Sequence, residues 1–355
     1  VGIEDPAVMY YTSGSTGHPK GVLHAARSLY AWRMQAYFWL DLEPGDRIWC
    51  TADTGWSKAG TSVIWGPWST GATAFQYDGP FVPSERLRLL AKHRVTVFCA
   101  SSTELLRLAG ENTSAYDLSS LRHVTHAAAP CPPEVKQAML DWWGPVIHEF
   151  YGATDLGAPT ACTPEQWLAK PGTVGTLTEG AIVKILDENG EECPVGVPGE
   201  IFAAVAYMPD FTYQKRDDER RAVELNGLIT VGDVGYFDAG AYLFLSDRKR
   251  DRVISGGVNS YPAEIEAVMI GIPGVLDCAV FGIPDAEYGE ALCAAVRVAP
   301  GTTEAAIRGA MKAKLANFKV PRVIEGHEEL PRDDSGKLLK RKLREPYWQR
   351  AGRAI

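Results

Sequence analysis

Residues 11–21 read YTSGSTGHPKG, and they constrain the fold more than any other part of the chain. The apolar and aromatic run Val8–Tyr11 before them predicts a short strand, and His24–Leu40 after them predicts a helix. A strand, a glycine-rich loop and a helix in this order indicate a phosphate cradle, because glycine lets backbone N–H groups turn toward an anion.

The composition of this loop favours phosphate binding over an ordinary polar turn. Serine and threonine hydroxyls can donate to phosphate oxygens, and Lys20 adds a compact positive charge. A Walker A loop is excluded because Lys20 follows Pro19 and precedes Gly21, whereas that motif needs lysine followed by serine or threonine. The predicted phosphate-loop residues are Thr12, Ser13, Gly14, Ser15, Thr16, Gly17 and Lys20.

This loop resembles the phosphate-binding signature of the acyl-adenylate-forming (AMP-binding) enzymes. That superfamily includes acyl-CoA synthetases, peptide-synthetase adenylation domains and firefly luciferase. The resemblance covers essentially all 355 residues in family order. Relatives carry a long region ahead of the loop, whereas only Val1–Ala7 precede its strand here. We therefore expect either a fragment or a natural short form that lacks the usual N-terminal region.

Composition favours two domains and argues against several functions. The length and the hydrophobic content of 46% suit a globular protein with a substantial core. A net charge of −8 argues against nucleic-acid binding, and the lack of any run of eighteen apolar residues argues against a membrane span. Seven cysteines without C-x-x-C spacing predict reduced thiols in a cytoplasmic protein and no zinc site.

The order of helix-like and strand-like segments predicts an α/β fold. In the first half, helices such as Ser84–His93 and Pro132–Trp143 alternate with buried strand runs such as Val95–Phe98, which favours parallel sheet layers. From about Ala181, short strands separated by turns predict a smaller β-rich subdomain, and a compact α+β unit follows Asp251. By resemblance, residues 1–247 form the AMP-binding core with a truncated N-terminal domain, residues 248–250 a hinge, and residues 251–355 a small mobile C-terminal domain.

The segment Tyr151–Asp155, YGATD, directly follows a predicted strand, at the sheet edge where α/β proteins bind ligands. Taken alone it suits an ordinary strand–turn. It resembles the family motif Y-G-x-T-E, which implies that Tyr151 and Gly152 contact adenine, Thr154 lies near the α-phosphate, and Asp155 holds Mg²⁺. Asp155 replaces the family glutamate and is one methylene shorter, so we expect its metal contact to pass through water.

Three further segments resemble nucleotide-binding parts of the family. The small residues Ala128, Ala129 and Pro130 would flank adenine, although tight backbone packing is the alternative. Asp233, which could also simply form a turn, would accept from both ribose hydroxyls. Arg248 would also touch the ribose, and Arg250 would be the hinge residue, although this charge run also suits a solvated surface.

Two C-terminal motifs and one aromatic residue complete the predicted site. Gly256 and Gly257, within S-G-G-V-N-S-Y-P-A-E-I-E, resemble the loop past which relatives thread the pantetheine of CoA. Lys337, within P-R-D-D-S-G-K, resembles the catalytic lysine that reaches the substrate carboxylate and the α-phosphate; in isolation it would be a solvated lysine. Trp56 resembles the aromatic residue bordering the acyl pocket, with a core tryptophan as the competing interpretation.

The resemblance implies an AMP-forming carboxylic acid–CoA ligase of fatty acid metabolism that uses ATP, Mg²⁺ and coenzyme A. The expected catalytic residues are Lys337, Thr154 and Asp155. Two alternatives stay open: an adenylating enzyme that loads a carrier protein, and a nucleotide-binding module without turnover. The expected partner is a small-molecule carboxylic acid. The identity of the acid, a homodimer, and a separate N-terminal region or polypeptide are left undecided.

Overall fold

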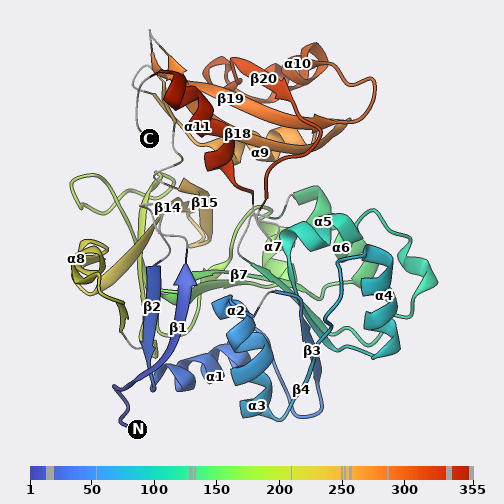
Figure 1. The fold of residues 1–355 in the computed structure, drawn as a ribbon, viewed down its shortest axis with the longest axis vertical. Coiled ribbons are helices and arrows are strands. Elements are labelled where there is room, and N and C mark those ends of the chain that lie inside the picture. The colour runs from blue at the N-terminus through green and yellow to red at the C-terminus, as the bar shows by residue number, and fades with distance from the viewer. Residues whose placement is uncertain are drawn as a thin grey trace. The chain divides into compact units, whose positions relative to one another are not determined.

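The computed structural model describes residues 1–12, 20–52, 54–127, 131, 133–208, 210–248, 251, 253–255, 258–285, 288–332 and 338–351. The chain forms two compact units, each with its own core (Figure 1). The first comprises Val1–Val231 and Tyr236–Phe244, and the second comprises Gly232–Gly235 and Leu245–Ile355.

A sheet of seven described strands forms the centre of the first unit, in the order β4-β3-β5-β6-β7-β8-β9. The first five strands in this order pair in parallel, and β8 and β9 pair antiparallel. This confirms the predicted parallel sheet layers. The strands are β3 (Arg47–Cys50), β4 (Thr73–Phe75), β5 (Val97–Ser101), β6 (His123–Ala127), β7 (Ile147–Ala153), β8 (Gly157–Cys162) and β9 (Thr176–Leu177).

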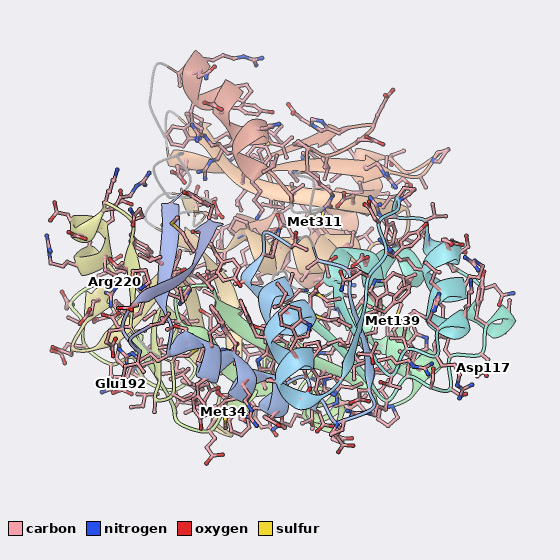
Figure 2. The ribbon with its side chains drawn as sticks, turned by 60° about the horizontal axis from the view of Figure 1, so that its bottom comes forward. Met34, Asp117, Met139, Glu192, Arg220 and Met311 are labelled. Carbon is pink, nitrogen blue, oxygen red and sulfur yellow. The ribbon has the colours of Figure 1, made fainter. Side chains whose placement is uncertain are left out.

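Helices cover both faces of this sheet. Successive side chains of a strand point to opposite faces, and apolar side chains on both faces need to be buried. Trp49 and Phe98 enter the core beneath α4 (Pro83–Lys92), α5 (Ser102–Leu108) and α6 (Pro133–Trp143), which lie next to one another in Figure 1. Met139 of α6 is fully buried there (Figure 2). Their neighbours Ile48 and Val97 pack on the opposite face against α1 (Ser28–Phe38) and the residues that follow it.

The predicted helix His24–Leu40 is wrong at its start. Residues Lys20–Ala25 form strand β2, which pairs antiparallel with β1 (Pro6–Thr12) and with β12 (Phe211–Tyr213), and the helix α1 begins only at Ser28. Pairing on both sides of β2 outweighs the local helix preference of this segment. The sequence motif 13–19 therefore joins the two strands of a hairpin, and those seven residues lie outside the described part of the chain.

The predicted β-rich subdomain is confirmed as a second, largely antiparallel sheet. Its strands are β10 (Ala181–Leu186), β11 (Gly199–Val205), β13 (Glu224–Leu225), β14 (Leu228–Phe237) and β15 (Leu243–Arg248). The short helix α8 (Asp217–Ala222) carries Arg220, which is labelled in Figure 2. Arg220 is buried and forms ion pairs with Asp210 and with Glu224 of β13, which connect α8 to this sheet.

Shorter helices connect these elements in the first unit. They are α2 (Ser57–Ala59), the π-helix Gly60–Trp65, α3 (Gly66–Thr70), the 3₁₀ turn Thr113–Ala115 and α7 (Pro164–Ala169). In the described part of the chain, we find no helix with the length and apolar character needed to cross a membrane.

The second unit contains one sheet in the order β17-β16-β19-β18, with β20 parallel to β19. Its core includes Met311 of α10 (Figure 2). The elements are β16 (Val253–Ser255), β17 (Val258–Ser260), α9 (Pro262–Ile270), β18 (Val275–Asp285), β19 (Gly289–Val298), α10 (Glu304–Lys314), the 3₁₀ turn Asn317–Lys319, β20 (Val323–Gly326) and α11 (Lys340–Arg350).

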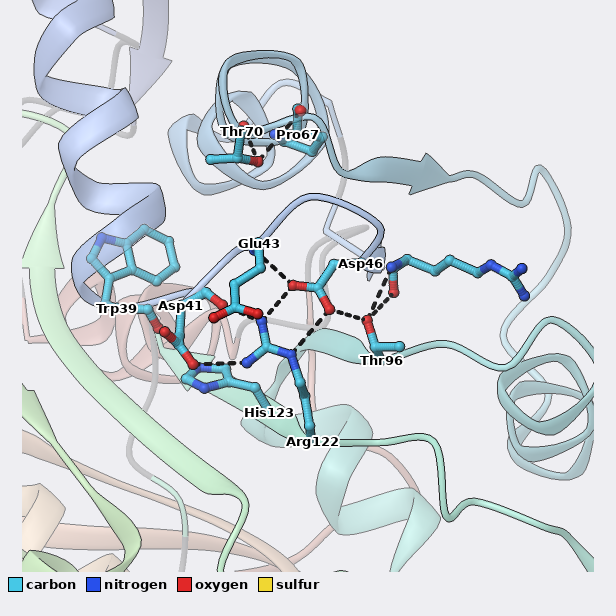
Figure 3. A network of polar contacts seen from close by, with 11 residues as sticks. Trp39, Asp41, Glu43, Asp46, Pro67, Thr70, Thr96, Arg122 and His123 are labelled. Carbon is cyan, nitrogen blue, oxygen red and sulfur yellow. Dashed lines mark hydrogen bonds and ion pairs between the residues drawn. The ribbon is translucent and has the colours of Figure 1, made fainter.

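An ionic network fixes the amino-terminal edge of the large sheet (Figure 3). Asp46, Thr96 and Arg122 immediately precede β3, β5 and β6. Arg122 donates to both carboxylate oxygens of Asp46 and to Asp41, and the Thr96 hydroxyl donates to Asp46 at 2.7 Å. The opposite, carboxyl-terminal edge of the sheet carries the candidate site.

Candidate active site

The carboxyl ends of the parallel strands bring several polar side chains to one edge of the large sheet. Thr51 follows β3, Ser102 follows β5, and β7 ends in Tyr151–Ala153. Tyr151 is buried, with 6% of its surface exposed. The YGATD segment lies at the predicted edge of the sheet, where open α/β sheets bind ligands, but its first three residues belong to β7 instead of following the strand.

The centre of the site is a contact between Lys20, Asp155 and Tyr213, which are far apart in the sequence. Lys20 begins β2, where its backbone pairs with Thr12 at the end of β1. The Lys20 ammonium lies 3.3 Å from Asp155 Oδ1 and donates to the Tyr213 hydroxyl at 2.6 Å. That hydroxyl donates to the same Asp155 oxygen at 2.5 Å. The fold thus brings together the cation and the carboxylate predicted from separate motifs.

The three groups share a nearly dry environment, which strengthens their interactions. The side chain of Asp155 is 6% exposed and that of Lys20 18%. Burial, with the neighbouring Asp155 carboxylate, raises the pKa of the Tyr213 phenol far above its usual range, so the phenol keeps its proton. Lys20 also lies over the Tyr213 ring, 3.9 Å from its centroid.

The donor set around Asp155 fits a magnesium ion that binds together with a nucleotide. Mg²⁺ prefers oxygen ligands and usually takes only one or two carboxylates, with phosphate and water completing its shell. Asp155 supplies one such carboxylate. Among the described residues, no group of three or more histidine, cysteine or acidic side chains could form a protein-only metal site.

The turn after β7 is fixed by a hydroxyl pair. The Ser57 hydroxyl of α2 lies 2.9 Å from the Thr154 hydroxyl. Gly152 allows the close approach of β7 and β8, because a Cβ atom there would meet the carbonyl oxygen of Gly157 and the Cα atom of Ala158. The segments around Trp56 and Thr154 therefore come together through Ser57.

His24 is a buried, uncharged histidine near the Asp155 carboxylate, and it packs against aromatic rings. It is 1% exposed and has its ring centroid 5.3 Å from that of Trp32 and 6.1 Å from that of Tyr10. Burial lowers the pKa of His24 to about 4, although the Asp155 carboxylate and the Thr154 backbone oppose the shift. The imidazole is therefore uncharged at neutral pH.

Trp56 is half-buried against a small cluster containing Cys50 and Cys99. These two cysteines are direct partners on β3 and β5. A hydrogen bond with Cys50, helped by the nearby Lys58 ammonium, lowers the pKa of the Cys99 thiol. The same hydrogen bond, together with burial, raises the pKa of Cys50. Lys58 donates to the Ala100 carbonyl at 2.9 Å. A cation and polarisable sulfur thus lie next to the segment predicted to border the acyl pocket.

The remaining predicted residues fall into two groups. Asp233 lies in β14 and Arg248 ends β15. The others lie outside the described residues, namely Ser13, Gly14, Ser15, Thr16, Gly17, Ala128, Ala129, Pro130, Arg250, Gly256, Gly257 and Lys337.

Sequence reasoning missed Tyr213, His24 and Ser57. Tyr213 lies in a three-residue strand followed by a charged run, and neither feature is a local signal for a site. His24 could have been noticed because it lies two residues after Val22 on β2 and so shares its inward face, but the segment was interpreted as a helix.

Two families of known proteins match most of the chain. The AMP-binding enzyme family matches residues 1–208, and the AMP-binding enzyme C-terminal domain matches residues 264–337.

Individual relatives match nearly the whole chain but extend beyond it. The mitochondrial acyl-coenzyme A synthetase ACSM3 of Mus musculus is 33% identical over 97% of this chain and 62% of that protein. The uncharacterized acyl-CoA ligase YtcI of Bacillus subtilis is 32% identical over 96% of this chain and 66% of its own length. The chain thus spans less than two thirds of these curated relatives.

Solved structures share the fold. The anthranilate CoA ligase AuaEII, solved with anthranoyl-AMP, superposes with a TM-score of 0.89 at 28% identity, covering 99% of this chain and 69% of that one.

Proposed function

Because the chain belongs to the AMP-binding enzyme family, we propose that it is an ATP-dependent carboxylic acid–CoA ligase. A carboxylate attacks the α-phosphate of ATP to give acyl-AMP and pyrophosphate; the thiol of CoA then attacks the acyl carbon and AMP leaves. The observation that carries this proposal is the buried contact of Lys20, Asp155 and Tyr213 beside the YGATD segment. A cation and a carboxylate held together at a ligand-binding edge suit a metal-bound polyphosphate.

We assign the residue roles from the motifs. Thr12, Lys20 and the loop between them bind the phosphate groups, Tyr151 and Gly152 contact adenine, and Thr154 lies near the α-phosphate. Ala128, Ala129 and Pro130 flank the adenine, and Asp233 and Arg248 bind the ribose. Lys337 stabilises the negative charge that develops during adenylation. Gly256 and Gly257 border the pantetheine path, and Trp56 borders the acyl pocket.

Magnesium belongs to this proposal through Asp155. Bound with the nucleotide, the ion would neutralise phosphate charge during adenylation. Asp155 would hold the ion, directly or through water, and Lys20 would neutralise phosphate charge.

We propose residues 248–250, with Arg250, as a hinge between a core of residues 1–247 and a C-terminal domain of residues 251–355. The two family matches, which fall on either side of this segment, support it. The proposed compartment is the cytoplasm, supported by seven unpaired cysteines, although several relatives are described as mitochondrial. The proposed partner is a small carboxylic acid.

The experiment is a product analysis of the purified chain with ATP, Mg²⁺ and CoA against short, medium-chain and aromatic acids. Mass spectrometry should detect acyl-CoA and AMP, and Lys337→Ala should abolish both. A product attached to a carrier protein, without acyl-CoA, would instead support the carrier-loading alternative. ATP binding without any product would support a nucleotide-binding module, which the replacement of the family glutamate by Asp155 favours.

A further inference from the structure

We propose that Tyr213 is a positioning residue that holds Asp155 in place for the metal–nucleotide complex when Lys20 turns to the phosphates. This inference rests on the proposed use of a nucleotide by this site.

The sheet fixes the position of Tyr213. Strand β12 pairs with β2, so that Tyr213 lies opposite Val22 and Phe211 lies opposite His24. The Tyr213 ring is 1% exposed and belongs to a cluster with Val22 and Phe211. A side chain held by pairing and packing has few alternative rotamers, so its hydroxyl points to one place.

The hydrogen bonds have a defined direction. A protonated phenol has one O–H donor, and an ammonium group has only donors. Because Lys20 Nζ lies 2.6 Å from the Tyr213 oxygen, Lys20 must donate there. The single Tyr213 O–H is then directed to Asp155 Oδ1 at 2.5 Å. A tyrosine phenol carries its proton at physiological pH, so this donor is present.

This order of donors allows Lys20 to change partner at low cost. A buried carboxylate that loses its donors pays a large desolvation penalty. If Lys20 moves to a phosphate oxygen, Asp155 retains the Tyr213 hydroxyl and does not turn away. The Tyr213 hydroxyl would thus keep Asp155 in position by donating to its carboxylate. Asp155 is one methylene shorter than the family glutamate and depends more on this hydrogen bond.

The test is a binding measurement on the intact chain, without acid or CoA. Isothermal titration calorimetry would measure ATP binding at several Mg²⁺ concentrations for the wild type and for Tyr213→Phe. The variant keeps the ring and removes only the hydroxyl. We expect the apparent Mg²⁺ affinity in the presence of ATP to fall about tenfold, as for outer-shell partners of metal ligands. ATP binding without Mg²⁺ should change less than about threefold.

Two controls separate positioning from a general loss of structure. Tyr10→Phe removes the hydroxyl of another buried tyrosine, which lies near Gly60 and Trp65, and should leave the Mg²⁺ affinity unchanged. In an Asp155→Asn background, Tyr213→Phe should have no further effect on Mg²⁺ affinity.

An equal Mg²⁺ affinity in the wild type and Tyr213→Phe, or additive losses in the double variant, would overturn the inference. The same holds if ATP binding by the wild type does not depend on Mg²⁺. A chain that shows Tyr213-dependent Mg²⁺ binding but makes no acyl-adenylate with any acid would refute the ligase proposal alone.

Discussion

The Ser57 hydroxyl lies 2.9 Å from the Thr154 hydroxyl and joins α2 to the turn after β7. Trp56 immediately precedes Ser57, and Asp155 immediately follows Thr154. One hydrogen bond therefore links the segment proposed to border the acyl group to the segment proposed to contact the α-phosphate. The segments proposed for acid binding and for nucleotide binding therefore share this contact.

Removing this link should slow adenylation without unfolding the protein. Ser57→Ala loses one hydrogen bond of about 1 kcal/mol, which corresponds to roughly a fivefold lower kcat/KM for ATP. Steady-state pyrophosphate release would measure it. Ser69→Ala, which removes a hydroxyl that donates to the Gly66 carbonyl in α3, is the matched control and should retain wild-type kinetics. Equal kinetics for Ser57→Ala and the wild type would remove Ser57 from the site.

His24 should make the protein sensitive to mild acid. Its pKa falls from 6.5 to about 4 on folding, so the unfolded chain binds a proton in this range that the folded chain does not. The contribution of His24 to the free energy of unfolding is therefore complete above pH 6.5. It decreases by up to roughly 3 kcal/mol as the pH falls toward 4. Chemical denaturation of His24→Leu across this range should show a shallower loss than the wild type.

The control for this measurement is His327→Gln, in the second unit, where the side chain is 32% exposed. It should keep the wild-type slope of stability against pH. An unchanged slope in His24→Leu would show that His24 is not the group that resists protonation. The buried His123 and the half-buried His148, whose pKa values burial also lowers, would then account for the acid sensitivity.

The Arg122 network should stabilise the edge of the sheet opposite the site. Burial favours the neutral form of Asp46, but hydrogen bonds from Arg122, the Glu43 N–H and Thr96 outweigh it and lower the pKa of Asp46. Arg122→Met should cost about 1–2 kcal/mol at pH 7, because Arg122 is itself one-third exposed. The difference from the wild type should shrink below about pH 4, where Asp46 becomes protonated in the unfolded chain.

Thermal unfolding at pH 7 and pH 3 would test this prediction. Arg221→Met breaks an ion pair to Asp218 in which both side chains are mostly exposed, and it should leave the melting temperature unchanged. A deficit for Arg122→Met that is as large at pH 3 as at pH 7 would indicate lost packing instead of the lost ion pair.

Gly152 should tolerate no side chain. Gly152→Ala would place its Cβ atom against backbone atoms of Gly157 and Ala158, which cannot rotate away, and should cost about 1–3 kcal/mol. Gly309→Ala in α10 is the control, since nothing lies within 4 Å of its added Cβ, and it should gain roughly 0.5–1 kcal/mol. Thermal unfolding would measure both variants. If Gly152→Ala and Gly309→Ala have the melting temperature of the wild type, the backbones of β7 and β8 are not as close at Gly152 as described.

Much of the fold could be predicted from local patterns. The helices around Leu87 and Met139 and the strand around Phe98 were predicted because their apolar residues recur at the spacing of the element. The YGATD segment was placed at a sheet edge because it follows a buried strand. These features depend only on neighbouring residues, which a sequence displays directly.

The rest depended on pairing between distant segments. We predicted a helix from His24 onward, but pairing with β1 on one side and β12 on the other holds Lys20–Ala25 as a strand. Tyr213 reaches Asp155 only because β12 joins that same sheet. No local pattern reports which strand will lie next to which, so the third member of the Lys20–Asp155–Tyr213 contact had no signal in the sequence.

The most direct test of the central claim is ATP–pyrophosphate exchange by the purified chain with Mg²⁺ and a panel of carboxylic acids, in the absence of CoA. This measurement isolates adenylation, the step assigned to Lys20, Asp155 and Lys337. The account predicts exchange that requires a particular acid and disappears in Lys337→Ala. Bound ATP without exchange for any acid in the panel would contradict it.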